Sequence, residues 1–282
     1  MPRLAAFPKG FFAALVERRM SVFDWIELAG GLDVDGVELY PLFLEWLEAP
    51  YLARVRAEAA RRGLAVPMLC HSPDFTRPDA DARRREVART REMLTATAGL
   101  GGGHCRVLSG QNRPGLDEAE ATRWVVECLW ELVGDAEAEG VVMCLENHYK
   151  DSLWRHPEFA QSSRRYLAIL DAVDSPWLKA QYDASNAVVA REDPYALLER
   201  VAPRVATVHA SDRRLVDGTL RHGVIGEGSN DYDRIFSALA GAGFDGWVSI
   251  EDGEGPTVEI GMENLRRSAS FLRASMARHY PG

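Results

Sequence analysis

The sequence contains only four cysteines, and no two of them form a CxxC pair. This absence argues against a zinc knuckle or a dithiol redox motif, so reduced cysteines in the interior are the simpler interpretation. No stretch approaches the roughly 18 consecutive apolar residues of a membrane-spanning helix. The start of the chain lacks the apolar stretch and the small-residue cleavage site of a signal peptide. We therefore expect a cytoplasmic protein with no membrane partner.

Basic residues are also outnumbered, since 33 Lys and Arg stand against 42 Asp and Glu, which gives a formal net charge of −9. Nucleic-acid binding depends largely on basic side chains that neutralise phosphates, so the composition argues against a nucleic-acid partner. Hydrophobic residues make up 46% of the chain, as in an ordinary globular protein that buries a large core. No linker, low-complexity segment or change of composition divides the chain, and we expect a single domain of residues 1–282.

Eight short runs rich in β-forming residues alternate with segments of helical spacing along the whole chain. The runs are residues 3–7, 36–40, 65–71, 104–109, 141–147, 178–183, 205–210 and 246–251. Most of them are continuously apolar, which is typical of parallel strands covered on both faces. Residues 116–139 illustrate the helical segments, with apolar positions every three or four residues and Gly140 as a C-terminal stop.

Such a string of βα units closes either as a barrel or as an open doubly wound sheet. Eight near-regular units favour the barrel, and so does the absence of a GxGxxG motif after an early strand. The glycines at 101–103 precede a strand rather than a helix, and we interpret them as a loop. The predicted fold class is α/β, a single (β/α)8 TIM barrel.

Four polar residues occupy equivalent positions where four of these strands end: Glu146, Asp183, His209 and Glu251. Any one of them alone is explained by a helix N-cap or by a structural histidine. Three carboxylates at one barrel mouth, however, would repel one another and lose hydration, and a bound cation explains their coexistence. Three oxygen donors and one imidazole suit one divalent ion such as Mn²⁺, with Mg²⁺, Co²⁺ or Zn²⁺ as alternatives. The open coordination positions would accept two neighbouring oxygens of a hydroxy-carbonyl substrate.

Glu38 and His71 end the second and third strands, and both are candidates for substrate contact. The alternatives are a buried ion pair for Glu38 and a packed imidazole for His71. Arg213 and Arg214 closely follow His209, and one of them is a candidate to bind a phosphate or carboxylate of the substrate through two parallel hydrogen bonds. We expect the other arginine to point to solvent.

The segment after Glu146 is rich in titratable groups. His148 or Lys150 would supply a general acid for a leaving group, while the alternatives are a packed imidazole and a solvated lysine. Trp154, in the same loop, is a candidate to stack on a sugar ring or an aglycone.

Six short motifs at the strand ends resemble those of the xylose isomerase-like TIM barrels, a family described broadly as sugar phosphate isomerases and epimerases. The motifs are Gly36-Val-Glu-Leu-Tyr40, Leu145-Glu-Asn-His148, Tyr182-Asp183, Val208-His209-Ala-Ser-Asp212, Gly226-Glu-Gly228 and Ser249-Ile-Glu251. The resemblance implies a small carbohydrate substrate and a homodimer or homotetramer. In the ketose 3-epimerase branch it implies a Mn²⁺-type ion held by the same four residues as above. It also implies that Glu146 and Glu251 act as acid and base on opposite faces of a metal-stabilised enediolate.

One position departs from that branch, because Asn186 stands where the branch often has a substrate-binding histidine. Asn186 is still able to hydrogen-bond a substrate hydroxyl, but it cannot act as an acid. The family also includes dehydratases and lyases of keto-sugars, inososes and 3-oxo-glycosides, which share the first deprotonation and form the main alternative function. A metal-bearing binding protein without catalytic activity is a further alternative.

Apurinic-site endonucleases form another branch of the family, in which a larger ligand set holds three zinc ions. The residues that match this set are His71, His104, Glu146, Asp183, His209, His222 and Glu251. Asn186 and Leu220 occupy two positions where the set needs a histidine and an aspartate. Because two ligands are missing and the net charge is −9, DNA repair is the weakest of the alternatives.

Overall fold

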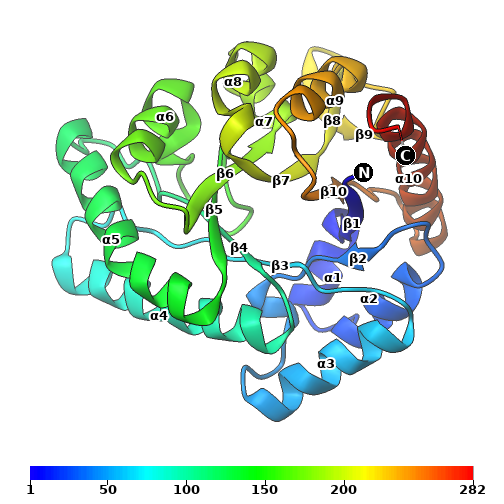
Figure 1. Cartoon of the computed structure of the whole chain (residues 1–282), viewed down its shortest axis with the longest axis horizontal. Coiled ribbons are helices and arrows are strands. Elements are labelled where there is room, and N and C mark those ends of the chain that lie inside the picture. The colour runs from blue at the N-terminus through cyan, green and yellow to red at the C-terminus, as the bar shows by residue number, and fades with distance from the viewer. Residues whose placement is uncertain (282) are drawn as a thin grey trace.

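The computed structural model describes residues 1–281, and eight parallel strands form its centre (Figure 1). The strands are β1 (Arg3–Phe7), β2 (Gly36–Val37), β3 (Met68–Cys70), β4 (His104–Val107), β5 (Val142–Glu146), β6 (Leu178–Asp183), β7 (Val205–Ala210) and β10 (Trp247–Glu251). Their order in the sheet is β2-β1-β10-β7-β6-β5-β4-β3. Parallel bridges from Gly36 to Ala65 and from Leu39 to Leu69 join β2 to β3, so the sheet closes on itself. The predicted (β/α)8 TIM barrel is confirmed.

Helices surround the strands in Figure 1. The α-helices are α1 (Phe12–Val16), α2 (Val22–Ala29), α3 (Ala49–Arg61), α4 (Ala80–Gly99), α5 (Glu118–Glu139), α6 (Ser163–Ala172), α7 (Ala184–Val189), α8 (Pro194–Val201), α9 (Tyr232–Gly241) and α10 (Val258–His279). Short 3-10 helices are η1 (Lys9–Phe11), η2 (Pro41–Phe43), η3 (Phe159–Gln161) and η4 (Ala202–Arg204). The helix predicted over 116–139 is α5, which is capped by the Asp117 side chain and ends at Gly140, whose φ of 65° favours glycine.

Five strands are shorter than the sequence predicted. β5 lacks residues 141 and 147, β10 lacks residue 246, and local hydrogen bonding explains the shortening of β3 and β4. Pro67 has no backbone N–H to extend β3 toward residue 65, so the ladder starts at Met68. The N–H of Ser109 donates to the Glu158 carboxylate at 2.7 Å, and β4 therefore ends at Val107. In the run predicted over 36–40, β2 covers only Gly36–Val37, followed by the single bridge at Leu39.

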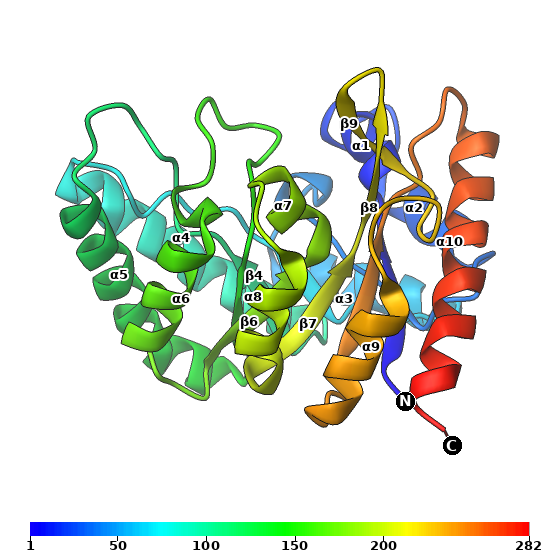
Figure 2. The same ribbon diagram turned by 90° about the horizontal axis from the view of Figure 1, so that it is seen from above.

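A hairpin of two antiparallel strands, which the sequence pattern did not predict, follows β7. It consists of β8 (Asp212–Val216) and β9 (Thr219–Gly223), and it pairs with itself rather than with the barrel. Its turn residues Asp217 and Gly218 have φ values of 49° and 75°, as a two-residue hairpin turn of the Asp-Gly type requires. Figure 2 shows the hairpin projecting at the end of the barrel opposite to the chain termini.

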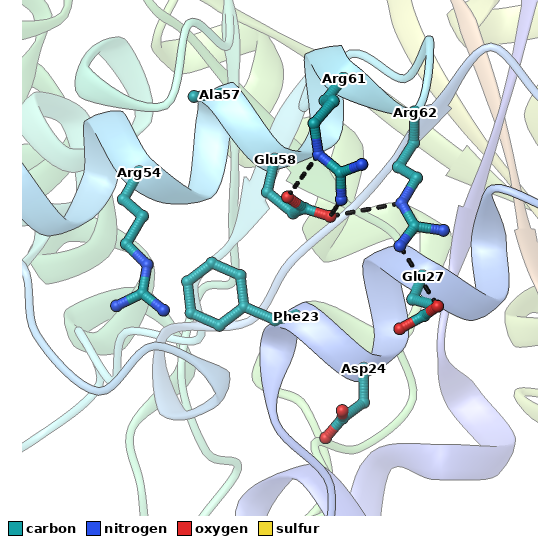
Figure 3. A pocket seen from close by; sticks show the side chains of 8 residues that line it. All are labelled: Phe23, Asp24, Glu27, Arg54, Ala57, Glu58, Arg61 and Arg62. Atoms are coloured by element: carbon teal, nitrogen blue, oxygen red, sulfur yellow. Dashed lines mark hydrogen bonds and ion pairs between the residues drawn. The ribbon is translucent and has the colours of Figure 1, made fainter.

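A surface groove lies between α2 and α3 on the outside of the barrel (Figure 3). Four of its charged side chains pair with one another, since Arg61 and Arg62 both bond Glu58 and Arg62 also reaches Glu27 at 3.3 Å. Of these exposed pairs, Arg62–Glu27 links the end of α3 to α2, and the paired groups leave little free charge to recognise a ligand.

All four cysteines are free and buried, which agrees with the expectation of a reduced interior. Within residues 1–281, every helix is too short or too polar to cross a membrane.

Candidate metal centre

The four residues predicted as metal ligands converge at the C-terminal end of the barrel. Glu146, Asp183 and Glu251 are the last residues of β5, β6 and β10, and His209 is the last but one of β7. Parallel register places Asp183 beside His209 and brings β10 to the other side of β7. One donor atom from each of the four residues lies within 4.8 Å of the others, and all four side chains are buried.

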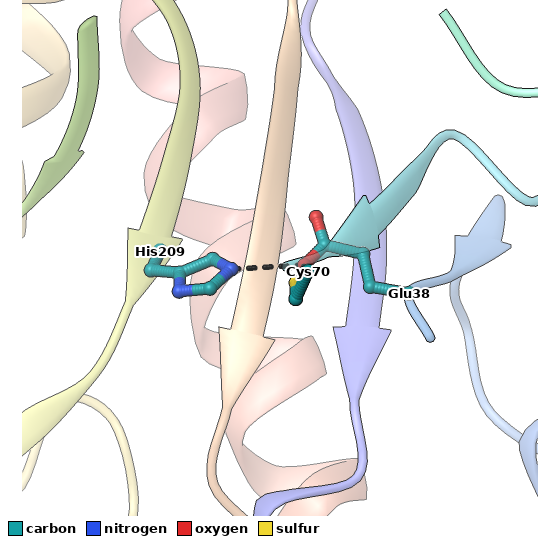
Figure 4. Close-up of side chains that lie close together, drawn as sticks. All are labelled: Glu38, Cys70 and His209. Carbon is teal, nitrogen blue, oxygen red and sulfur yellow. Dashed lines mark hydrogen bonds and ion pairs between the residues drawn. The ribbon is translucent and has the colours of Figure 1, made fainter. Parts of the chain in front are cut away.

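The imidazole of His209 is held from behind by Glu38, as Figure 4 shows. Nε2 of His209 lies 2.9 Å from Oε2 of Glu38, which also contacts the Cys70 thiol at 3.5 Å. Nδ1 of His209 faces Oε1 of Glu146 at 3.3 Å and Oε2 of Glu251 at 3.7 Å. This buried nitrogen has no hydrogen-bond partner by geometry among the described residues. In the tautomer that donates to Glu38, its lone pair points at two carboxylates, an arrangement that a proton or a metal ion must relieve.

The pKa values of the four residues also indicate that a positive charge is needed at this centre. Burial and the charges of Glu251 and Glu146 raise the pKa of Asp183 to about 7. Although burial opposes the shift, the charges of Glu146 and Glu38 raise the pKa of His209 well above its usual value. Protons therefore compensate the crowded negative charge when no cation does. Three carboxylates and one imidazole nitrogen that are exposed to one another and shielded from water fit a divalent ion.

Asp183 is held in place by its neighbours and also caps a helix. Its carboxylate accepts hydrogen bonds from the Ser211 hydroxyl at 2.9 Å and from the N–H of Asn186 at 3.0 Å, at the start of α7. The Asn147 amide bonds the Asp183 backbone on both sides. The N-cap interpretation and the metal-ligand interpretation of Asp183 are thus compatible.

Two cations that the sequence analysis missed, the buried Arg106 and the partly buried Lys9, hold the two glutamates. Nη1 of Arg106 lies 3.1 Å from Oε2 of Glu146, and Nζ of Lys9 lies 2.8 Å from Oε1 of Glu251. Although burial opposes both shifts, His148, His209 and Arg106 lower the pKa of Glu146 to about 2, and Lys9 and His209 lower that of Glu251. Two features of the sequence could have identified them, namely an arginine inside an apolar strand and a lysine just after β1.

A narrow cavity opens beside this centre. It is lined by Phe7, Lys9, Phe12, Tyr40, Arg106, His148, Asp151, Ser152 and Glu251. Asp151, another residue that the sequence analysis did not single out, accepts hydrogen bonds from Ser72 at 2.7 Å and from Tyr40 at 3.4 Å. Of the predicted substrate-binding residues, His148 lines this cavity, and its buried Nδ1 has no partner within residues 1–281.

The other predicted substrate-binding residues lie at different distances from the centre. Asn186 donates to Oε1 of Glu146 at 3.3 Å, so it lies against a candidate ligand. Glu38 is fully buried behind His209 and does not line the cavity. His71 is buried, and burial followed by the charge of Arg106 lowers its pKa to about 3.

Lys150, Trp154 and Arg213 lie beyond the cavity. Lys150 and Trp154 are half-buried, and neither side chain forms a hydrogen bond or ion pair within the part of the chain described. Arg213 is buried over the ring of Tyr149, at 4.9 Å from its centroid, whereas Arg214 is exposed, as expected for one of the two arginines.

The larger ligand set of the endonuclease branch is not brought together. His104 begins β4 and lies at the opposite end of the barrel, near Arg3 and Trp247 at the starts of β1 and β10. Among the described residues, the clusters that are able to hold a metal contain neither His71, His104 nor His222. A trinuclear site is therefore not supported.

Comparisons with known proteins agree on the fold. A family model described as "Xylose isomerase-like TIM barrel" matches residues 23–275. An inosose dehydratase of Bacillus thuringiensis (strain Al Hakam) is 23% identical over 178 residues, which is 58% of this chain and 57% of that protein. The chain therefore spans little more than half the length of this curated relative.

Solved structures extend the similarity to the whole chain. A D-psicose 3-epimerase from Clostridium cellulolyticum H10, solved with D-tagatose, has a TM-score of 0.79 and 17% identity, with 97% of this chain and 99% of that chain covered. The IolI protein, solved with a bound zinc atom, has a TM-score of 0.80 and 16% identity, with coverage of 99% and 100%. At these identities the likeness concerns the fold.

Proposed function

Because this chain belongs to the family of xylose isomerase-like TIM barrels, we propose that it is a divalent-metal-dependent isomerase or epimerase. Its substrate is a small sugar or a sugar-derived hydroxy-carbonyl compound, and residues 1–282 form the single catalytic domain. A cytoplasmic location and a homodimer or homotetramer stay predictions.

The observation that carries this proposal is the matched placement of Glu146 and Glu251. Each directs one carboxylate oxygen at Nδ1 of His209, and the other oxygen pairs with a cation, the buried Arg106 for Glu146 or the partly buried Lys9 for Glu251. The cations keep both glutamates ionised at neutral pH, which a group that takes a proton from carbon requires. A purely structural pair of buried glutamates would not need both oxygens oriented in this way.

Glu146, Asp183, His209 and Glu251 are the residues that would hold the metal ion. When bound, a divalent ion of this kind polarises a carbonyl and lowers the pKa of the neighbouring C–H bond. The orphaned Nδ1 of His209 supports a ligand at this position. Mn²⁺ suits the oxygen-rich donor set best, and Mg²⁺, Co²⁺ or Zn²⁺ remain alternatives.

Proton transfer falls to the two glutamates. One of them, as the carboxylate, removes the proton from the carbon next to the carbonyl. The other first takes up a proton from solvent and then delivers it to the opposite face, which inverts that carbon. Asn186 and Arg106 fix Glu146, while Lys9 fixes Glu251, so neither carboxylate has to reorganise during the transfer. Glu38 acts through His209 as a positioning residue.

Dehydration of a keto-sugar, an inosose or a 3-oxo-glycoside is the second candidate. The curated relative reported above is named an inosose dehydratase. The position of His148 also favours it, because this imidazole lines the cavity next to Lys9 and is able to direct a proton at a leaving hydroxyl. A glutamate would take the proton from carbon, and the hydroxyl would leave as water after protonation.

The test is incubation of the Mn²⁺-loaded protein in D₂O with a panel of ketoses, inososes and 3-oxo-glycosides. Deuterium at the carbon next to the carbonyl is the expected result, and the product mass distinguishes the two candidates. An isomer retains its mass apart from the deuterium, whereas a dehydratase product has lost water. Absence of exchange with every compound would contradict an enzymatic role.

Matched variants assign the exchange to the centre. We expect Glu146→Gln and Glu251→Gln to lose exchange, as the wild type does in EDTA. Glu158→Gln is the control, because Glu158 is an equally buried carboxylate that lies outside the donor set. Loss of exchange in the control as well would show that burial rather than position matters.

A further inference from the structure

Arg213 is a buried cation without a counter-ion. Only 6% of its surface is exposed, and its guanidinium forms no ion pair within the described chain. Its Nε is buried and has no hydrogen-bond partner among residues 1–281. Because a buried charge is costly unless it is paired, this arrangement indicates a missing anion.

The nearest carboxylate in the sequence is not available to Arg213. Asp212 accepts backbone N–H groups from Gly226 at 3.0 Å, Gly228 at 2.9 Å and Asn230 at 3.2 Å, and it thereby fastens the segment after the hairpin. The contact is tight, since a Cβ at Gly228 would lie 2.1 Å from the Asp212 carboxylate. The Gly226-Glu-Gly228 motif therefore donates its backbone N–H groups to Asp212, and the Arg213 guanidinium stays unpaired among the described residues.

One face of the Arg213 guanidinium is covered, and its N–H edge is not used. The group lies over the ring of Tyr149, 4.9 Å from the centroid, in a cation–π contact. Stacking of this kind fixes the plane of the guanidinium and leaves its N–H donors free. Such an oriented edge matches two oxygens of a carboxylate or a phosphate.

His222 lies opposite Arg213 in the β8–β9 ladder. Both of its ring nitrogens are buried and have no hydrogen-bond partner in the part of the chain that the structure describes. Burial and the charges of Arg213 and Lys9 lower its pKa to about 4, so it is neutral at pH 7 and able to donate one hydrogen bond. Surplus positive charge and a free donor thus occur together.

Arg213, His222 and Tyr149 lie at the same end of the barrel as the candidate metal centre. The hairpin starts three residues after His209, and Tyr149 follows Glu146 by three residues. Figure 2 shows the hairpin at the end of the barrel where the strands carrying the four candidate ligands end. A substrate bound at the centre would therefore extend toward Arg213.

We infer that Arg213 and His222 bind an anionic group of the substrate, so that the enzyme acts on a sugar acid or a sugar phosphate. The inference rests on the proposed function for the identity of the substrate. The anion site itself is defined by the hairpin and is independent of the metal ligands.

Binding of small probes to the metal-free protein tests the site directly. Glycerol, glycerate and glycerol 3-phosphate share a three-carbon frame and differ in charge, and calorimetry in EDTA compares them. We expect at least one anion to bind and glycerol not to bind, and the better anion distinguishes carboxylate from phosphate. Equal affinity of the wild-type protein for all three probes would overturn the inference. This comparison needs no variant.

Two neighbouring arginines provide the matched variants. Arg213→Gln is expected to lower the affinity for the anion about tenfold to a hundredfold, because the charge-assisted hydrogen bonds are lost. Arg214→Gln is the control, because Arg214 is exposed and faces the other side of the same strand. Equal affinity of Arg213→Gln and wild type, or equal losses in both variants, would contradict the site.

Deuterium exchange separates this inference from the proposed function. Anion binding that Arg213→Gln abolishes, without exchange on any compound, would contradict the proposed enzyme and leave the anion site standing. Exchange that is equally efficient on neutral and anionic compounds, and unchanged in Arg213→Gln, would contradict the anion site and leave the enzyme standing.

Discussion

Nε2 of His209 lies 2.9 Å from Oε2 of Glu38, and this contact determines which ring nitrogen faces the carboxylates. A histidine that donates from Nε2 keeps the lone pair of Nδ1 for a metal ion. Nδ1 is also the nitrogen nearest to Glu146 and Glu251. Glu38 thus selects the tautomer that a metal site needs, although it does not reach the centre itself.

Removal of Glu38 is expected to weaken metal binding. Glu38→Ala should lose about 10- to 100-fold in Mn²⁺ affinity because the orientation of His209 is no longer fixed. Glu38→Gln should lose less, since the amide oxygen still accepts from Nε2. Competition with a chromophoric chelator measures both affinities.

Cys70→Ala serves as the control in the same assay. Glu38, Cys70 and His209 form an alternative cluster that is also able to hold a metal. If the ion bound there, Cys70→Ala would weaken binding and Asp183→Asn would not. We expect the reverse, with loss in Asp183→Asn and near wild-type affinity in Cys70→Ala.

Arg106 should be important for stability. Its side chain is 5% exposed and pairs with the buried Glu146, so Arg106→Met leaves a buried carboxylate without its cation. The expected cost is about 3 to 5 kcal/mol in the free energy of unfolding, measured by urea denaturation of the metal-free protein. Arg91→Met is the comparison, because Arg91 bonds Asp135 at 2.8 Å but is 43% exposed, and it should cost less than about 1 kcal/mol. An equal loss of unfolding free energy in Arg106→Met and Arg91→Met would contradict the role of Arg106 as the partner of a buried charge.

Lys9 should set the acid limit of activity. Because its ammonium lowers the pKa of Glu251, Lys9→Met should raise that pKa and protonate Glu251 at a higher pH. The acid limb of the pH profile for deuterium exchange should move up by about 1 to 3 pH units. Lys179→Met, at the far end of β6 from Asp183, should leave the profile in place. A lower rate without a shifted limb would indicate a packing role for Lys9 instead.

Glu158 should make stability depend on pH. Its carboxylate is buried, Oε2 has no partner within residues 1–281, and burial raises its pKa from 4.5 to about 8. Between these values the folded state holds a proton that the unfolded state releases, so stability falls as pH rises. Glu158→Gln, which does not titrate, should match the wild type below pH 4.5 and exceed its melting temperature progressively up to about pH 8. A constant difference across this range would contradict the shifted pKa.

The sequence predicted the barrel and the four candidate ligands because both follow from local patterns. Continuous apolar runs identify buried parallel strands, and the C-terminal ends of those strands meet at one face of a barrel. Glu146, Asp183, His209 and Glu251 each stand at such an end, so their meeting required only the register of neighbouring strands.

The partners of these ligands needed the three-dimensional structure. Lys9 and Glu251 are 242 residues apart, and no local pattern connects them. Arg106 lies within β4, where the strand pattern shows a charge but not the glutamate that pairs with it. Glu38 stands at a strand end like the ligands, and only the direction of its side chain places it behind His209. The hairpin had a local signal in Asp217 and Gly218, which the search for βα repeats passed over.

Among the described residues, the two-stranded β8–β9 sheet shares no ladder with the eight central strands, although Arg213 of β8 lies over the ring of Tyr149 in the loop after β5. A change in its length or sequence would leave the register of β5, β6, β7 and β10 untouched. Transplanting the hairpin between relatives would therefore transfer the preference for charged or neutral sugars, while the affinity for the ion would be inherited from the recipient.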